Sequence, residues 1–155
     1  MRSKGDVGML GYAMSEENLE KILSHRLGMV CSDGGGFAVD GPTRRGSPHP
    51  RGAGSFPRVL GRYVREKKVM TLSQAIRKMT SLPASRLRLG DRGNLAPGMA
   101  ADVVVFDPST VSDRATFDAP FQYPVGINFV IVNGVVALRD GQRNPVGSGR
   151  ALRVQ

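Results

Sequence analysis

The sequence has very few of the residues that build disulfide frameworks and metal sites. Among 155 residues there is one cysteine, Cys31, and there are two histidines. A single cysteine excludes a disulfide framework and a paired-cysteine metal site. No run of 18 apolar residues is present, which excludes a transmembrane helix, and the basic N-terminus lacks the apolar stretch of a signal peptide. We therefore expect a cytoplasmic protein with no membrane partner.

Acidic residues are also scarce, and the excess of positive charge is concentrated. The formal net charge is +9, and residues 44 to 92 hold 13 Lys and Arg against two acids, Glu66 and Asp91. Such a block favours nucleic acid or an anionic surface, but it is also typical of a solvated face or of a face covered by another part of a longer protein. RNA-binding aromatic motifs, zinc-finger spacings and heptad repeats are absent. We therefore do not expect nucleic acid as the main partner.

The abundant residues indicate a small globular protein with many turns. Apolar residues make up 40% of the chain, which is enough for one compact domain with a core at this length. The 20 Gly and 10 Pro exceed average usage and predict many turns rather than long helices.

The N-terminal part of the pattern predicts a helix, a short strand and a long loop. Ser15 is suited to cap a helix that Gly28 stops. Residues 29 to 31 then form a short apolar run, typical of a buried strand with Cys31 as a small core residue. Residues 37 to 54 show no periodicity and predict a long loop. The apolar face of the first helix is expected to consist of Leu19, Ile22 and Leu23.

Two further helices and a short turn are predicted before residue 90. Ser55 and Pro57 are typical of a helix start, and Thr71 with Gln74 has the spacing of a capping box. Pro83 begins a short turn. The residues expected to face inward are Val59, Leu60, Tyr63 and Val64 in the first helix, and Ala75, Ile76 and Met79 in the second.

After Gly90 the periodicity changes to that of strands. Residues 101 to 106 predict one strand, and residues 127 to 132 and 135 to 138 predict a hairpin around Asn133-Gly134, a dipeptide that suits a type I′ turn. Asp140-Gly141 predicts another turn, and the tail from Arg143 is expected to be irregular. The pattern favours an α/β segment over residues 1–90 and a small β segment over residues 91–155.

Several stretches, taken in order and spacing, carry a family resemblance. They are Cys31–Gly34, Pro48–Arg51, Ser55–Gly61, Ile76–Ala84, Gly98–Pro108 and Val132–Val136. Together they resemble the D-aminoacylase branch of the amidohydrolase superfamily. The resemblance runs from Met14 to Arg150, and it implies a C-terminal portion of an N-acyl-D-amino-acid deacylase.

The fold that this resemblance implies is a (β/α)8 barrel with a small β-sandwich built from both chain ends. Residues 29–31 would be the last barrel strand, residues 56–87 the flanking helices, and residues 98–139 the C-terminal strands of the sandwich. A complete barrel takes roughly 250 residues, so this chain is expected to hold only the end of one. The expected fold class is therefore α/β with an incomplete barrel.

Asp33 is the candidate catalytic residue. The local pattern alone favours a structural role for Asp33 as the start of an Asp-Gly turn. The resemblance instead implies that Asp33 is the aspartate of the family's active site. A carboxylate at this position takes a proton from the attacking water and passes it to the departing nitrogen. His49 and Arg51 lie in the long loop and are candidates to bind the carboxylate of the substrate, with ordering of the loop as the alternative role.

The metal site is where the chain departs from the family. The resemblance implies zinc held mainly by residues of earlier strands, including a His-x-His pair that is absent here. Zinc catalysis needs about three protein ligands, and His25, near the end of a helix, is expected to interact with the helix dipole instead. We therefore expect no metal ligands in this chain.

The function that the resemblance implies is zinc-dependent hydrolysis of the amide bond of N-acyl-D-amino acids, which are small-molecule substrates. The chain alone is not expected to be competent. An N-terminal half on another chain is one expected partner, and exposed apolar faces would favour an oligomer. Two alternatives stay open: a non-catalytic basic module that binds nucleic acid or another partner, and a truncated inactive remnant.

Overall fold

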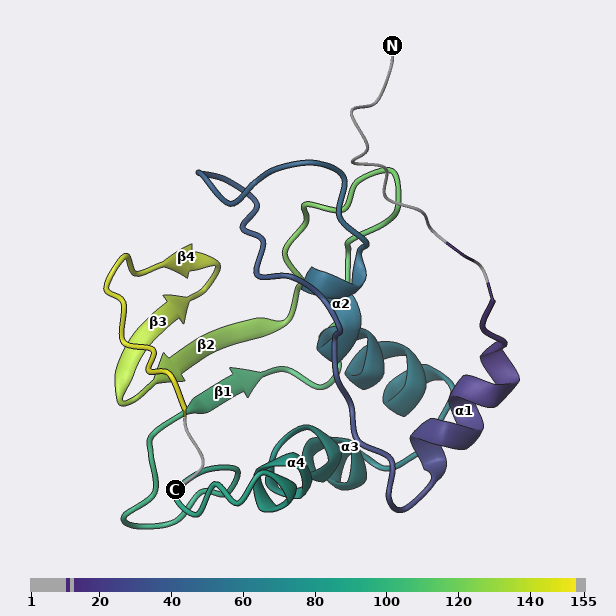
Figure 1. Ribbon diagram of the computed structural model, residues 1–155, viewed down its shortest axis with the longest axis horizontal. Coiled ribbons are helices and arrows are strands. Elements are labelled where there is room, and N and C mark those ends of the chain that lie inside the picture. Colours follow the sequence, from purple (N-terminus) through teal and green to yellow (C-terminus); the bar gives the residue numbers. More distant parts are fainter. Residues whose placement is uncertain (1–10, 12, 153–155) are drawn as a thin grey trace.

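A computed structural model describes residue 11 and residues 13–152 as short helices beside one small sheet (Figure 1). The four strands form an antiparallel sheet in the order β1-β2-β3-β4, which agrees with the expected α/β character. No helix in the described part of the chain is long and apolar enough to cross a membrane. The elements are α1 (Glu16–Ser24), α2 (Arg51–Arg58), the π-helix η1 (Val59–Glu66), α3 (Leu72–Met79), α4 (Ser81–Arg86), β1 (Val103–Phe106), β2 (Ile127–Val132), β3 (Val135–Arg139) and β4 (Gln142–Arg143).

Helix α1 has the expected N-terminal cap, but the helix is shorter and its apolar face is narrower than the sequence predicts. The Ser15 hydroxyl accepts a hydrogen bond from the N–H of Asn18 at 3.1 Å. The helix ends at Ser24, before Gly28. Leu19 and Leu23 contact the core, whereas Ile22 is 53% exposed, so its expected inward position was wrong. The reason is that α1 touches the core along one i, i+4 row only, and Ile22 lies beside that row.

The strand expected at residues 29–31 is not formed. This stretch is extended, and its link to a neighbouring element is one hydrogen bond from the N–H of Val30 to the carbonyl of Lys78 in α3, at 3.2 Å. A strand needs a parallel or antiparallel neighbouring strand. Among the described residues no strand pairs with residues 29–31. Cys31 is consequently exposed rather than a core residue, and Met29 is 45% exposed.

Helix α2 starts at Arg51 and not at Ser55, so the expected loop over residues 37–54 ends at Pro50. Pro57 lies in the last turn of α2, directly before the change to the π-helix η1. Proline has no N–H for the helical hydrogen-bond ladder, which fits a change of helix type at this point. The apolar side was predicted well, since Val59, Leu60 and Tyr63 are buried and Val64 packs against the same core.

The capping box and the two-residue turns were predicted correctly. The Thr71 hydroxyl accepts from the N–H of Gln74, and the Gln74 side chain accepts from the N–H of Thr71. Asn133 and Gly134 have φ values of 49° and 80°, the positive values of a type I′ turn. Asp140-Gly141 makes the second turn, which pairs β3 with the short β4. The turn expected from Pro83 is helix α4, which starts at Ser81.

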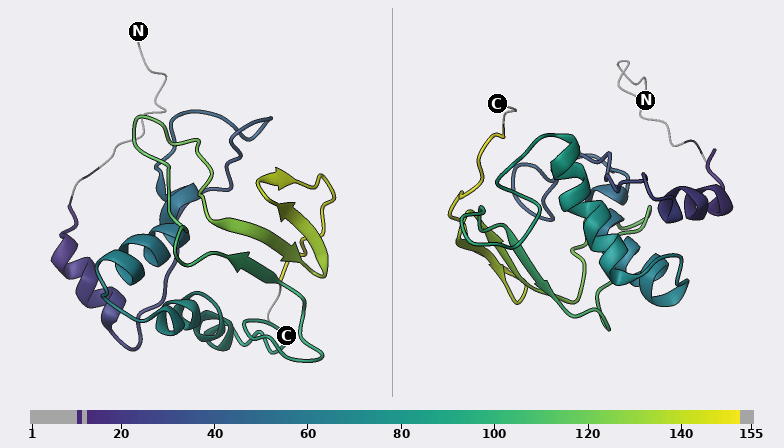
Figure 2. Two further views of the ribbon diagram at one scale, coloured as in Figure 1. Left: turned by 180° about the vertical axis from the view of Figure 1, so that it is seen from behind. Right: turned by 90° about the horizontal axis from the view of Figure 1, so that it is seen from below.

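One apolar core joins the helices to the segment between β1 and β2. Val111, fully buried in that segment, packs with residues of the helices, and Figure 2 shows the helices alongside the sheet from two further sides. A methyl group on Gly61 of η1 would lie 2.7 Å from the carbonyl oxygen of Val111, so the two backbones are in close contact. The division at residues 90 and 91 stays a prediction. The buried cluster consists of Leu23, Val59, Leu60, Tyr63, Met70, Ala75 and Val111.

Candidate functional site

Asp33 follows the stretch over residues 29–31, and the chain bends there through a left-handed backbone conformation. Its φ is 46°, in the left-handed region that Asp tolerates better than most residues. Its N–H points back to the Cys31 sulfur at 3.3 Å, and the N–H of Gly34 points back to the Ser32 hydroxyl at 3.3 Å. The Asp33 side chain is 82% exposed. The bend therefore presents the carboxylate to solvent.

Two glycines bring this bend against the start of α2. A methyl group on Gly34 would lie 2.6 Å from the Cα atom of Gly52, so the backbones approach more closely than side chains would allow. Across this contact the Arg51 guanidinium forms an ion pair with Asp33, with 3.0 Å between Nη2 and Oδ2. The candidate catalytic carboxylate and one of the two candidate substrate-binding residues are thus in direct contact.

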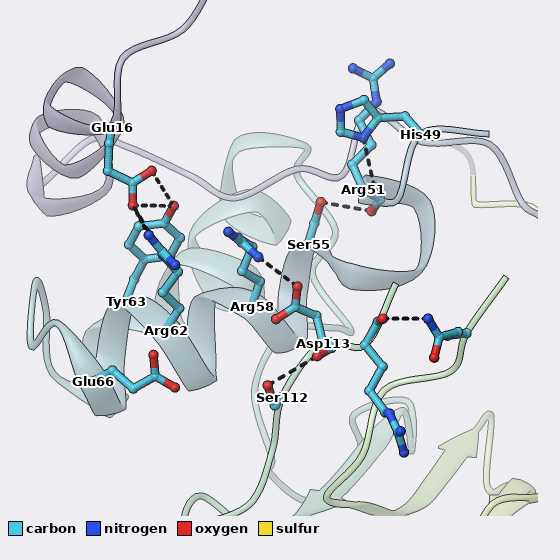
Figure 3. Close-up of polar contacts among 12 residues, drawn as sticks. Glu16, His49, Arg51, Ser55, Arg58, Arg62, Tyr63, Glu66, Ser112 and Asp113 are labelled. Carbon is cyan, nitrogen blue, oxygen red and sulfur yellow. Dashed lines mark hydrogen bonds and ion pairs between the residues drawn. The ribbon is translucent and has the colours of Figure 1, made fainter. Parts of the chain in front are cut away.

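His49 belongs to the same group of residues. Its Nδ1 accepts a hydrogen bond from the N–H of Arg51 at 3.0 Å, a contact drawn in Figure 3. Its ring meets the Phe117 ring edge to face, with 4.9 Å between the centroids and an interplanar angle of 76°. Burial, followed by the nearby charge of Arg51, lowers the pKa of His49. A lower pKa favours the neutral imidazole, whose unprotonated Nδ1 can accept this hydrogen bond.

Helix α2, which begins at Arg51, is fixed from the other side by Asp113. The Arg58 guanidinium contacts the Asp113 carboxylate at 3.0 Å, as Figure 3 shows. Only 15% of the Asp113 side chain is exposed. A methyl group on Gly54 would lie 3.2 Å from Cβ of Asp113, so the helix and this segment are closely packed.

The sequence interpretation missed the contribution of the segment from Asp113 to Tyr123. Besides Asp113 and Phe117, this segment places the Tyr123 hydroxyl to accept from the N–H of Val39 at 3.3 Å. Phe121 lies under the guanidinium of Arg44, 4.9 Å from the ring centroid. These contacts join residues far apart in the chain, and no local spacing predicts them. The positions of His49 and of the loop before it depend on them.

Part of the basic block borders the same loop. Arg44 and Arg45 line an open hollow of about 530 Å³ together with residues 46, 47 and 118–121. Asp118 is the acid in this lining. The hollow gives the loop a cationic face beside the segment that carries Phe117.

The residues of this site do not fit a zinc centre on their own. The part of the chain that the structure describes has no group of three or more His, Cys, Asp or Glu that could hold a metal ion. The Asp33 carboxylate is paired with Arg51, and His25, the C-terminal cap of α1, accepts from the N–H of Leu27 at 3.3 Å. A metal at this site would need ligands from elsewhere.

Comparison with known proteins decides the family. The model of the amidohydrolase family matches residues 36–138. The chain belongs to this family. Among curated proteins of Alcaligenes xylosoxydans xylosoxydans, it is 51% identical to N-acyl-D-glutamate deacylase over 82% of the chain and 25% of the relative. It is 41% identical to D-aminoacylase over 94% of the chain and 28% of the relative. The chain therefore spans about a quarter of the length of these amidohydrolases.

A solved amidohydrolase structure shows the same relationship in three dimensions. The N-acyl-D-glutamate deacylase of Bordetella bronchiseptica, in complex with zinc and a phosphonate inhibitor that mimics the tetrahedral intermediate, superposes with a TM-score of 0.75 at 49% identity. The match covers 84% of this chain and 26% of that one. The expected resemblance to the D-aminoacylase branch is confirmed, and zinc is the metal of this structural relative.

Proposed function

We propose that this chain is the catalytic-aspartate portion of a zinc-dependent amidohydrolase that hydrolyses the amide bond of N-acyl-D-amino acids. The observation that carries the proposal is the contact of Asp33 with Arg51 at an exposed bend, in a chain 51% identical to an N-acyl-D-glutamate deacylase. The Asp33 carboxylate is accessible to water, as a general base must be, and the neighbouring guanidinium can bind an anionic substrate.

The proposed place in the fold is the end of a (β/α)8 barrel followed by strands of a β-sandwich. Residues 29–31 would become the last barrel strand once a neighbouring strand is present. The exposure of Leu27 and Met29, at 49% and 45%, supports this, because apolar side chains at a barrel strand are normally covered. The exposed valines of β1, Val104 and Val105, likewise support an additional layer at the sheet. In isolation such faces favour self-association.

In the proposed reaction Asp33 accepts a proton from the attacking water and delivers it to the departing nitrogen. Arg51 would exchange its ion pair with Asp33 for the carboxylate of the N-acyl-D-amino acid, a group that a guanidinium binds with two parallel hydrogen bonds. His49 would hold the backbone of Arg51 in place through its Nδ1. The metal ligands would come from the remainder of the enzyme.

A chimera tests the proposal. The chain would replace the matching quarter of the Alcaligenes N-acyl-D-glutamate deacylase, and we expect the chimera to bind zinc and hydrolyse N-acyl-D-glutamate. Asp33→Asn should lower kcat by at least ~100-fold with zinc retained. Asp40→Asn is the matched control, because Asp40 is another exposed aspartate between α1 and α2 and pairs with Arg143. It should leave kcat within about twofold of the parent, a change too small to signal lost transition-state stabilisation.

The same chimera separates the alternatives. Full activity in Asp33→Asn would show that another group transfers the proton. A zinc-loaded but inactive parent chimera would favour the inactive remnant, and tight, salt-sensitive binding of the chain to nucleic acid would favour the basic module. The 155-residue chain by itself is expected to be inactive and metal-free. Turnover by the chain alone would contradict the requirement for the remaining ligands.

A further inference from the structure

Lys78 is the one charged residue that is buried among those the structure describes, with 4% of its surface exposed. Lysine is almost never this buried unless it is paired with an acid. In the described part of the chain no carboxylate pairs with it, and its ammonium points to backbone carbonyls instead. Burial, together with the charge of Arg77, lowers its pKa. Its position therefore needs an explanation other than an ion pair.

Among the described residues, the hydrogen bonds of Lys78 outside its own helix fall on the stretch from His25 to Val30. The ammonium donates to the carbonyl of His25 and to that of Gly28, the latter at 3.0 Å. The backbone carbonyl of Lys78 accepts from the N–H of Val30 at 3.2 Å. The carbonyls at the end of a helix lack partners within it, and Lys78 supplies one as the chain leaves α1. Lys78 thus holds this stretch in place through both its side-chain ammonium and its backbone carbonyl.

This stretch leads directly to Asp33. Asp33 is three positions after Val30, with two residues between them, and an extended chain over that interval spans at most about 10 Å. The next tether along the chain is the Asp33 ion pair with Arg51. The segment that carries Asp33 is therefore held at one end by α3 and at the other by the start of α2. Loss of the first tether would let the bend at Asp33 move.

We propose that Lys78 is a positioning residue for Asp33, fixing the segment before it so that the carboxylate stays beside Arg51. This inference rests on the proposed function of Asp33, but its structural part can be measured without any activity. A methionine at residue 78 would have a similar length and would fill the same space without the cost of burying a charge. The lysine is the better residue only if its hydrogen bonds to the carbonyls are needed.

The first test uses nuclear magnetic resonance on the 155-residue chain and three variants. Lys78→Met removes the donors, Lys78→Arg retains donors, and Arg77→Met removes a neighbouring charge on the same helix. In Lys78→Met we expect the amide signals of Asp33 and Gly34 to shift and to show faster motion, while the amides of the β2–β3 hairpin keep their exchange protection. Lys78→Arg should restore the signals at least in part, and Arg77→Met should leave them unchanged. Unchanged Asp33 and Gly34 signals in Lys78→Met would overturn the inference.

The unmodified chain gives a result even if Lys78→Met does not fold. The Val30 amide should exchange with solvent at least ~100-fold more slowly than that of Gly36, because only the former is hydrogen-bonded to α3. Equal exchange would also overturn the inference. In the chimera, Lys78→Met should lower kcat up to ~100-fold with KM little changed, as expected for a displaced catalytic group. Failure of the proposed function would appear separately, as activity that survives Asp33→Asn.

Discussion

Glu16, at the scale of the single residue, ties helix α1 to helix η1. Its carboxylate accepts a hydrogen bond from Lys67 at 2.8 Å. It also accepts from Arg62 at 3.1 Å and from the hydroxyl of the buried Tyr63 at 3.2 Å, and these two residues are drawn beside it in Figure 3. The hydrogen bond from Lys67 contributes most to lowering the pKa of Glu16 to about 2, while partial burial opposes it. The ionised form of Glu16 therefore stabilises the folded state.

The pH dependence of stability follows from this shift. The folded pKa is below the ordinary value of 4.5, so the stabilisation is complete above that value and is lost as the pH falls toward 2. Because 44% of the side chain is exposed, solvent screening reduces the contribution to about 1 kcal/mol. Glu16→Gln should lower the free energy of unfolding by that amount at pH 6 and by much less at pH 2.5, as measured by urea denaturation. Glu17→Gln, which removes only an exposed pair with Lys21, is the control. An equal loss at both pH values would contradict the assignment.

At the scale of the element, helix η1 and the segment between β1 and β2 are in close contact at Gly61 and Val111. An alanine methyl group would lie 2.7 Å from the Val111 carbonyl oxygen, and a backbone atom cannot rotate away as a side-chain end can. We expect Gly61→Ala to destabilise the protein by about 1–3 kcal/mol, the usual cost of overpacking, despite the better helix propensity of alanine. Gly90→Ala, where a methyl group would meet open space, is the control for thermal unfolding. A higher melting temperature for Gly61→Ala would show that the segment simply moves away.

Elements whose signal lies within a few residues could be predicted from the sequence. The Thr71 capping box and the Asn133-Gly134 turn depend on contacts between residues at most three apart, and the structure has both. The start of α2 at Arg51 was missed because no capping side chain marks it and Pro50 precedes it. The strand at residues 29–31 was wrong because strand formation depends on a neighbour that the local pattern does not contain.

The candidate site was predictable to a similar extent. Asp33, His49 and Arg51 were singled out, and the structure places Arg51 in contact with both of the others. Their roles in catalysis and binding stay predictions. Phe117 and Asp113 were missed because their contacts with His49 and Arg58 cross more than 50 residues of chain, and no local periodicity reports such a pairing.

At the scale of the whole molecule, the segment from Asp107 to Gly126 holds the helical and β parts together. The Arg65 guanidinium donates to the Val111 carbonyl at 2.7 Å, and Arg58 pairs with Asp113. Val111 is fully buried in the shared core. The helices and the hairpin should therefore unfold in one transition, although they come from different parts of the chain.

The Arg58–Asp113 pair gives a test of this coupling. Asp113 is mostly buried, so removal of Arg58 leaves its carboxylate without an ion-pair partner. We therefore expect Arg58→Met to lower the free energy of unfolding by about 2 kcal/mol. Asp113→Asn should cost less, and the double variant should be more stable than the sum of the single effects predicts, by about 1 kcal/mol or more. Hydrogen exchange should show the same loss of protection in the slowest amides of α3 and of the β2–β3 hairpin. The contrary outcome is that Arg58→Met lowers the protection of the helix amides alone and leaves the hairpin amides protected. In that case the helices and the hairpin would unfold as independent units, divided near residue 90 as the sequence predicts.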